Sequence, residues 1–431
     1  MDSIKPNLAL ESEGLVRVET GEFLSADQAH CLDLLRSGEN VFLTGGAGCG
    51  KSFVIRQFVK EIDPKHMPIL ASTGAAAVLI GGRTFHSFFG LGIMEGGPEA
   101  TYERARKDSR LMSRLRKVEG FIIDEISMIS GQALRVAEAL AQKARETTLP
   151  WGGMRVIAVG DFAQLPPVSP NQNRDWCFVH DVWRSSGFQS CMLTENHRVE
   201  DQEYKSILDL VRVAKVDERV KEYLNDKVFF HDEEEDMTRL FPRRLQSDDF
   251  NKKKLAEIAE EEILIPTIYF GEEKYISVLK KASPIPENLI LKIGCKVMFL
   301  QNDPQKRWIN GTRGTVVDVL PDKIVVKKDR GRDVQVDKSS FSVLDAEGNV
   351  VASLIQFPLG LAYATTIHKS QGATMDELWC DLRSLWEPGQ AYVALSRLRT
   401  GRGLKLLGWN PRSILADPKV LAFYLALNSN V

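Results

Sequence analysis

The sequence has no apolar stretch that approaches the ~18 residues required for a transmembrane helix. It also shows no secretion signal, because the first residues, MDSIKPNLALESEGLVRVETGEF, are acidic and contain no apolar core. We therefore expect no membrane partner. The absence of an N-terminal extension or targeting sequence favours a bacterial or viral cytoplasm, with an organelle or the nucleus as alternatives.

Cysteine is scarce and scattered along the chain. No two cysteines have the CxxC spacing, which argues against a zinc site and against a disulfide framework. We expect reduced thiols, as in a cytosolic type of compartment. The six cysteines are Cys31, Cys49, Cys177, Cys191, Cys295 and Cys380.

The chain also lacks an excess of charge of either sign. Lys and Arg number 56 and Asp and Glu number 58, so the formal net charge is −2. The net charge provides no general attraction to phosphate, and any binding of nucleic acid must come from a local groove. With 431 residues, of which 43% are hydrophobic, the chain is long enough for roughly two to four globular domains.

Short apolar runs alternate with helical stretches between about residues 25 and 195. Such runs indicate a parallel sheet that is buried on both faces. A polar stretch at 90–117 interrupts the pattern as an insertion, and the short β-type pieces at 294–354 are typical of a small antiparallel barrel. The α/β pattern returns at residue 356. The predicted strands are 40–44, 68–72, 120–124, 155–160 and 191–194, and the best predicted helices are 51–62 and 130–146.

Residues 45–52, GGAGCGKS, match the phosphate-loop pattern G-x-x-x-x-G-K-[ST]. A predicted strand precedes the loop and an amphipathic helix follows it, so that backbone amides and the helix N-terminus can hold phosphates. Lys51 can reach the β- and γ-phosphates, and Ser52 can ligate Mg²⁺. The alternative is an ordinary glycine-rich turn. The expected nucleotide contacts in this loop are Gly46, Ala47, Gly48, Cys49, Gly50, Lys51 and Ser52.

Two carboxylates end the apolar strand GFIIDE at 120–125. Asp124 is placed to hold Mg²⁺, and Glu125 is placed to deprotonate the attacking water. The next strand ends in GDFAQLPP, where Gln164 can sense the γ-phosphate and position water. The alternatives are acidic surface residues at a strand end and, for Gln164, a polar turn before the two prolines.

Six segments in this order, GGAGCGKS, IIDEISM, GDFAQLPPV, LTENHR, TTIHKSQGATMD and AYVALSRLR, resemble the motifs of superfamily 1 helicases. Within that group the chain is similar to the petite integration frequency (PIF) type, which is related to RecD-like helicases. The resemblance implies an α/β protein with two RecA-like P-loop motor domains, a small inserted wedge in the first and an SH3-like β-barrel in the second. Its implied boundaries are a lead-in at 1–24, a first motor domain at 25–195 with the wedge at 90–117, a second motor domain at 196–293 and 355–431, and the barrel at 294–354.

The same resemblance assigns residues beyond the phosphate loop to ATP. Gln28 is similar to a glutamine that binds adenine, although a surface glutamine at a helix start is an alternative. Gly372 is placed to approach the γ-phosphate. Arg198 and Arg397 match two arginines that face the γ-phosphate, although Arg397 could instead form a salt bridge with a distant Asp or Glu.

A further set of residues matches positions that contact single-stranded DNA in related helicases. Hydroxyl groups there can hold phosphates, and an aromatic ring can stack on bases. Phe88 and Phe89 are expected in the core instead, and the match at Asn251 is weak because the family's preceding threonine is not obvious. The DNA-binding candidates are Thr73, Thr84, His86, Ser87, Asn251, Thr366, His368 and Lys369.

The resemblance therefore implies an ATP- and Mg²⁺-dependent DNA helicase that moves 5′ to 3′ on single-stranded DNA. Expected substrates are 5′-tailed duplexes, G-quadruplexes and RNA–DNA hybrids, in genome maintenance such as replication, repair, recombination and telomere-type processes. A monomer, or a weak dimer on DNA, is expected. Two alternatives remain open: a translocase stimulated by single-stranded DNA that unwinds little alone, and a regulatory P-loop ATPase that moves along nothing.

Overall fold

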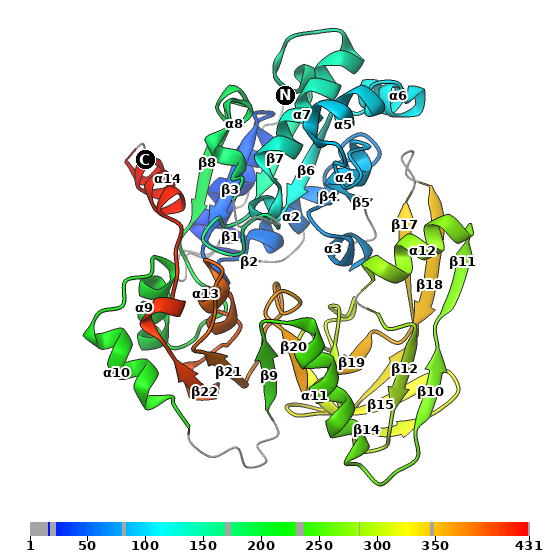
Figure 1. The fold of residues 1–431 in the computed structure, drawn as a ribbon, viewed down its shortest axis with the longest axis vertical. Helices are drawn as coiled ribbons and strands as arrows, with labels where there is room; N and C mark the ends of the chain where they lie inside the picture. Colours follow the sequence, from blue (N-terminus) through cyan, green and yellow to red (C-terminus); the bar gives the residue numbers. More distant parts are fainter. Residues whose placement is uncertain are drawn as a thin grey trace, which may run out of the picture.

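Two parallel sheets form the centres of two α/β lobes, and an antiparallel region lies beside the second lobe (Figure 1). The computed structural model describes residues 16–17, 23–79, 83–168, 174–229, 237–283, 285–344 and 349–429. Most of the expected lead-in, residues 1–24, therefore lies outside the described residues. Within the described residues, no helix is long and apolar enough to cross a bilayer.

The first lobe contains a six-stranded parallel sheet in the order β5-β4-β6-β7-β3-β8. All five predicted strands are present, and the sixth, β5, was missed because it has only two residues. The predicted helix at 51–62 is confirmed as α2 (Lys51–Val59), which buries Val54, Ile55 and Phe58. The strands are β3 (Val41–Gly45), β4 (Ile69–Ala71), β5 (Arg83–Thr84), β6 (Gly120–Asp124), β7 (Arg155–Val159) and β8 (Gln189–Leu193).

Further helices, among them α1 and α3–α7, surround this sheet. The polar stretch at 90–117 forms two of them, α5 and α6, which pack against α7 at the top of Figure 1. Arg114 on α6 is buried and donates to the Phe88 carbonyl through Nε (3.1 Å) and Nη2 (2.7 Å), which fastens the insertion to the core. Phe88 and Phe89 are fully buried, as expected. The helices are α1 (Ala26–Arg36), α3 (Gly74–Leu79), α4 (Phe85–Phe88), α5 (Gly97–Ala105), α6 (Ser109–Lys117) and α7 (Gly131–Arg145).

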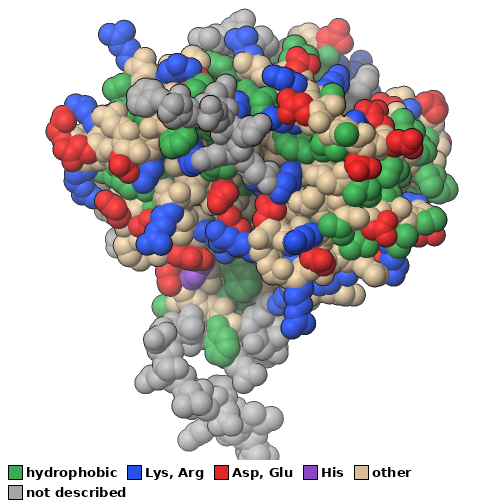
Figure 2. Space-filling model, turned by 90° about the horizontal axis from the view of Figure 1, so that it is seen from below, with side chains coloured by type: hydrophobic (Ala, Val, Ile, Leu, Met, Phe, Trp, Pro, Cys, Tyr) green, Lys and Arg blue, Asp and Glu red, His purple; other side chains and the backbone are tan. Residues whose placement is uncertain are grey.

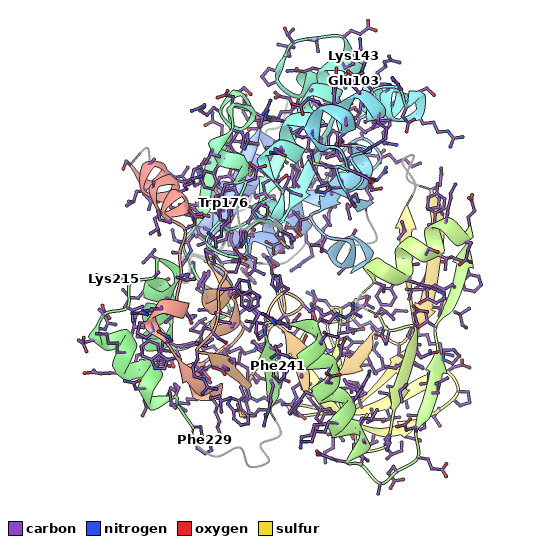
Figure 3. All side chains as sticks on the ribbon, in the orientation of Figure 1. Glu103, Lys143, Trp176, Lys215, Phe229 and Phe241 are labelled. Carbon is purple, nitrogen blue, oxygen red and sulfur yellow. A yellow bond between two sulfur atoms is a disulfide. The ribbon has the colours of Figure 1, made fainter. Side chains whose placement is uncertain are left out.

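The second lobe contains a four-stranded parallel sheet in the order β20-β9-β21-β22. Phe241, labelled in Figure 3, ends the strand β9. The strands are β9 (Thr238–Phe241), β20 (Ala364–Thr366), β21 (Leu378–Leu382) and β22 (Leu404–Trp409). The helices are α9 (Gln202–Arg212), α10 (Glu218–Asp226), α11 (Arg244–Ala256) and α13 (Gln390–Leu395).

The antiparallel region extends beyond the expected limits of 294–354. Its main sheet has the order β16-β15-β14-β13-β19 and a core that includes Val297, Val316 and Val326. A second sheet, β11-β18-β17, packs with α12 (Glu273–Ala282), and both α12 and β17 contact α3 of the first lobe. The strands are β10 (Ile263–Pro266), β11 (Ile268–Gly271), β12 (Asn288–Leu291), β13 (Lys296–Phe299), β14 (Arg313–Val319), β15 (Lys323–Lys328), β16 (Val334–Asp337), β17 (Ser339–Leu344), β18 (Val350–Gln356) and β19 (Leu359–Leu361).

The chain returns to the first lobe at its C-terminal end. Helix α14 (Pro418–Asn428), red in Figure 1, lies beside α8 (Asp181–Ser185) and buries Val420 and Tyr424 in the core of the first sheet. Trp176, labelled in Figure 3, donates its indole N–H to Asp417 just before α14 (2.9 Å). We expected the segment 355–431 to lie in the second motor domain, but its last helix packs against the first lobe.

One pair of cysteines corrects the expectation of reduced thiols. Cys31 on α1 and Cys191 on β8 form a disulfide, with their Cα atoms 5.8 Å apart. The sequence could not indicate this pair because 160 residues separate the two positions, and only the packing of α1 against β8 brings them together. Cys49, Cys177, Cys295 and Cys380 are free and buried.

Candidate nucleotide site between the two lobes

The phosphate loop connects β3 to α2 as the sequence predicted. Gly48 and Gly50 both have φ of +87°, a conformation that glycine adopts at no steric cost. The Lys51 ammonium donates to the carbonyls of Gly45 (2.9 Å) and Gly46 (3.1 Å), which holds it inside the loop. Free amides at the N-terminus of α2 and a cation inside the loop provide the surroundings that a phosphate group requires.

Residues from two other segments hold the outer side of the loop. Asn196 donates to the Ala47 carbonyl (2.8 Å), and the His197 amide donates to the Gly48 carbonyl (3.0 Å). Gln28 is buried rather than exposed: its Oε1 accepts from the Ser25 amide (3.2 Å), and its Nε2 donates to the Cys49 carbonyl (3.4 Å). The alternative of a surface glutamine is therefore wrong, and Gln28 lies against the loop.

A cavity of about 330 Å³ opens between the loop and the second lobe. The cavity brings together residues that lie far apart in sequence but that the motifs assign to one site. Gly46 and Cys49 of the loop, together with Gln28 and Asp124, do not line the cavity. The predicted residues that line it are Ala47, Gly48, Gly50, Lys51, Ser52, Glu125, Gln164, Arg198, Gly372 and Arg397.

Glu125 has the surroundings of a general base. Its backbone has φ of +55°, which is strained for a residue with a side chain, and its Oε2 is buried without a hydrogen-bond partner among the described residues. Burial, and then the neighbouring Asp124, raise the pKa of Glu125 to about 7. Burial also raises the pKa of Asp124, whose Oδ1 accepts from the Glu125 amide (3.1 Å). A carboxylate with a pKa near neutrality is suited to accept a proton.

Arg397 forms no ion pair in the part of the chain that the structure describes. It is 1% exposed, and its guanidinium donates to the carbonyls of Val393 (2.7 Å) and Ser370 (3.2 Å) and to the Ser396 hydroxyl (2.8 Å). The alternative of a salt bridge is therefore wrong. Burial, and then nearby Arg198, lower the pKa of Arg397 to about 9, so the guanidinium stays charged at neutral pH.

Arg198 comes from the segment that follows β8 and donates to the Ser396 carbonyl (2.9 Å). Two guanidinium groups thus line one cavity, and neither forms an ion pair with an acidic residue among those described. Because an unpaired buried charge is costly, the cavity favours an anionic ligand.

Gln164 connects the two lobes at the edge of the cavity. It is 4% exposed, and its Oε1 accepts from Nε2 of Gln371 in the second lobe at 3.4 Å. A Cβ atom at Gly389, which precedes α13, would lie 2.1 Å from the Gln164 carbonyl oxygen. The lobes are therefore in close contact at the residue predicted to sense the γ-phosphate.

Three of the predicted DNA contacts cap turns that follow parallel strands. The hydroxyls of Thr73, Thr84 and Thr366 accept from backbone amides three residues further on, at 3.2, 3.1 and 3.1 Å. These residues follow β4, end β5 and end β20, so both parallel sheets present a hydroxyl at the carboxyl ends of their strands. Ser87, His368 and Lys369 are exposed, whereas His86 is half-buried and burial lowers its pKa.

The side chain of Asn251 on α11 forms hydrogen bonds within the protein. Its Nδ2 donates to the Ala364 carbonyl and its Oδ1 accepts from the Ala364 amide, both at 2.8 Å. These bonds fasten α11 to β20, which ends at Thr366. Asn251 also lines a groove of about 480 Å³, together with Arg244, Lys252, Lys280 and Lys369.

Comparison with known proteins shows the family of this chain. The PIF1-like helicase family matches residues 23–219. The ATP-dependent DNA helicase Pif1 of Bdellovibrio bacteriovorus is 71% identical over 411 residues, which cover 95% of this chain and 93% of the relative. The chain belongs to the PIF1-like helicase family. It is accordingly an ATP-dependent helicase, an enzyme.

Solved structures of PIF1-like helicases have the same mixed α/β fold. The structure of Bacteroides sp Pif1 in complex with ADP-AlF4 has a TM-score of 0.84 and 29% identity, and covers 95% of this chain and 98% of its own. Bacteroides Pif1 bound to ssDNA has the same coverage and 28% identity, but a TM-score of 0.64.

Several residues of this PIF1-like site were missed from the sequence. Tyr392 accepts from the Ala47 amide of the phosphate loop (2.8 Å), and Arg56 and Arg399 line the cavity. Tyr392 and Arg399 lie inside AYVALSRLR, so the motif itself contained the signal. Arg56 lies one helical turn after Ser52, a spacing that places both on one face of α2.

Proposed function

We propose that this chain hydrolyses ATP to move 5′ to 3′ along single-stranded DNA and to unwind duplexes ahead of it. The main observation in support of the proposal is the cavity that both Lys51 of the first lobe and Arg397 of the second lobe line. A ligand held by both lobes favours their closed arrangement, and its hydrolysis removes that preference.

The residues of the cavity fit a nucleoside triphosphate. Lys51 and the loop amides hold the phosphates, Glu125 accepts the proton of the attacking water, and Gln164 orients that water. Arg198 and Arg397 stabilise the charge that develops on the phosphate oxygens.

The surroundings of Ser52 and Asp124 also fit Mg²⁺. Ser52 lines the cavity, and Asp124 directly precedes Glu125, which lines it too. Mg²⁺ is usually held by one or two protein oxygens together with phosphates and water. When bound there, the ion neutralises charge on the phosphates.

Single-stranded DNA would lie across the carboxyl ends of both parallel sheets. We assign phosphate contacts to Thr73, Thr84 and Ser87 in the first lobe and to Thr366, His368 and Lys369 in the second. We assign His86 to the same DNA path. We assign Asn251 to it indirectly, because Asn251 fastens β20, which ends at Thr366. The α5–α6 insertion would act as the wedge, and the antiparallel region would be the SH3-like domain of the second lobe.

We further propose that the antiparallel region moves when DNA binds. Unliganded Pif1 from Bacteroides sp gives a TM-score of 0.83 with this chain, against 0.64 for the form bound to ssDNA. In this chain α12 and β17 contact α3, the helix that follows Thr73. A strand that approaches Thr73 would change these contacts.

The test combines an ATPase assay with strand displacement. We expect ATP hydrolysis to be stimulated by single-stranded DNA and a duplex with a 5′ tail to be opened, while a 3′-tailed duplex of the same sequence stays closed. G-quadruplex and RNA–DNA substrates with the same tail extend the test. If single-stranded DNA stimulates ATP hydrolysis but no strand is displaced, the chain is the non-unwinding translocase. If DNA does not change the rate of ATP hydrolysis, the chain is the regulatory ATPase.

A further inference from the structure

A buried cluster outside the nucleotide cavity joins three distant parts of the chain. Asp161 follows β7 in the first lobe, Arg212 ends α9 in the second lobe, and Tyr424 lies on α14. The Asp161 side chain is inaccessible to solvent, and Tyr424 is 8% exposed. None of the three was among the predicted site residues.

Asp161 receives hydrogen bonds from both lobes. Its Oδ1 accepts from Nη2 of Arg212 (2.8 Å), from the Ala163 amide (3.1 Å) and from the Tyr424 hydroxyl (3.0 Å), and its Oδ2 accepts from Nε of Arg212 (3.3 Å). Burial alone would raise the pKa of Asp161, but Arg212 outweighs it and the pKa is lowered. The pair is therefore ionised, and its forked geometry fixes the angle between the two groups.

The Tyr424 hydroxyl joins this ion pair to the strand that leads into the phosphate loop. A phenol has one proton, and here it is donated to Asp161, so the oxygen accepts from the Phe162 amide (3.0 Å) and from the Thr44 hydroxyl (2.9 Å). Thr44 directly precedes Gly45. The Arg212 guanidinium also lies over the Tyr424 ring, 4.6 Å from its centroid.

Both ends of the cluster connect to the cavity. On one side, the Gln164 amide donates to the Asp161 carbonyl (3.0 Å), so the turn that presents Gln164 is built on Asp161. On the other side, Arg212 belongs to α9, and Tyr204 of that helix donates to the Leu395 carbonyl of α13 (2.7 Å). Leu395 lies two residues before Arg397. The cluster therefore links Gln164 to Arg397, and both of these residues are predicted to contact the γ-phosphate.

We propose that Tyr424 and Arg212 are positioning residues that fix Asp161 between the lobes, so that a shift of Gln164 in the cavity is transmitted to α9 and the second lobe. The inference rests on the proposed function. It concerns how many base pairs are opened for each ATP, whereas the proposed function concerns whether ATP hydrolysis drives unwinding at all.

The replacement Tyr424→Phe tests the inference because it keeps the ring and its stacking with Arg212 and removes only the hydroxyl contacts. We expect the number of base pairs opened per ATP to fall roughly 3- to 10-fold, the size expected when coupling between sites is disturbed. The KM for ATP should stay within about twofold of the unmodified chain, because Tyr424 does not line the cavity. Arg212→Lys, which keeps the charge and loses the fork, should lower the same ratio.

The matched control is Ser186→Ala. Ser186 accepts a buried hydrogen bond from the Trp151 indole (2.7 Å) within the first lobe, so its loss costs stability without touching the connection between the lobes. We expect its ratio of base pairs to ATP to be unchanged. Thr44→Val removes one hydrogen-bond partner of Tyr424 with little change in shape, and it should also lower the ratio. It serves as the test in place of Tyr424→Phe if that variant does not fold.

The double variant Tyr424→Phe with Arg212→Lys should be less affected than the product of the single effects, because both act through Asp161. Ratios unchanged from the unmodified chain in all the cluster variants, or an equal loss in Ser186→Ala, would overturn the inference. An unmodified chain that hydrolyses ATP without opening DNA would instead overturn the proposed function, a result visible before any variant is made.

Discussion

Arg397 shows how a single side chain can be held ready for a ligand. Backbone carbonyls orient its guanidinium while no carboxylate among the described residues neutralises it. We expect Arg397→Ala to lower the DNA-stimulated rate of ATP hydrolysis on the order of 10³-fold, the effect that an arginine finger would have. Arg397→Lys should recover little, because an ammonium cannot reproduce the fork.

Arg402 provides the control for Arg397, since it lies five residues further on and does not line the nucleotide cavity. Hydrolysis by Arg402→Ala should remain within about twofold of the unmodified chain. A steady-state ATPase assay with saturating single-stranded DNA measures both variants, and near-normal turnover in Arg397→Ala would remove it from the mechanism.

Glu125, which we propose as the general base, also has a cost in stability. Its pKa of about 7 in the folded chain lies above the ordinary value of 4.5. Between these pH values the folded chain holds a proton that the unfolded chain has released, so its contribution to stability is lost as pH rises from 4.5 through 7. Glu125→Gln removes this loss, and we expect it to raise the free energy of unfolding at pH 8 by about 3 kcal/mol.

The same replacement should abolish hydrolysis, because glutamine accepts no proton. In the unmodified chain the rate of hydrolysis should rise with pH through about 7 as Glu125 ionises. Urea unfolding of the two proteins at pH 5 and pH 8 measures the stability difference. A difference that is the same at both pH values would show that Glu125 is not protonated in the folded chain.

At the scale of elements, α11 and β20 are joined by one side chain. Asn251 bonds both the amide and the carbonyl of Ala364, two residues before the Thr366 cap. We expect Asn251→Ala to lower the free energy of unfolding by about 1–3 kcal/mol and to weaken binding of single-stranded DNA. Because the lost contact is internal, the slope of affinity against salt should not change.

Asn251→Asp separates the two possible roles of this residue. It keeps the bond from the Ala364 amide, so an internal role predicts partial recovery of stability and affinity. A direct contact with a phosphate predicts the opposite, since a carboxylate repels the strand. Fluorescence anisotropy with a labelled oligonucleotide at several salt concentrations, together with thermal unfolding, distinguishes these outcomes.

The elements of the first lobe could be predicted because their signals are local. Continuous apolar runs indicated β3, β6 and β7, and GGAGCGKS indicated the loop between β3 and α2. The cluster of Asp161, Arg212 and Tyr424 could not be predicted, because Arg212 and Tyr424 lie on helices outside the recognised motifs and meet Asp161 only through the packing of the lobes. The Cys31–Cys191 bond was missed for the same reason, since its two positions become neighbours only when α1 packs against β8.

At the scale of the whole molecule, the net charge of −2 makes binding to DNA a local property. Positive and negative side chains are intermixed across the face that Figure 2 shows, seen from below Figure 1. Affinity for single-stranded DNA should therefore depend on the cations near the carboxyl ends of the sheets. Affinity should still fall steeply with salt, because those cations displace counterions from phosphates.

Two lysines allow this to be tested with variants that change the net charge by the same amount. Lys369 is exposed beside Thr366, and Lys419 is exposed on α14 next to the first lobe, outside the groove that contains Lys369. Lys369→Ala should weaken binding and reduce the slope of log affinity against log salt by about 0.7, the value for one phosphate contact on a single strand. Lys419→Ala, which changes the net charge equally, should bind as the unmodified chain does. Equal weakening in both variants would mean that the overall field attracts the strand, and an unchanged slope in Lys369→Ala would place the path of the strand away from β20.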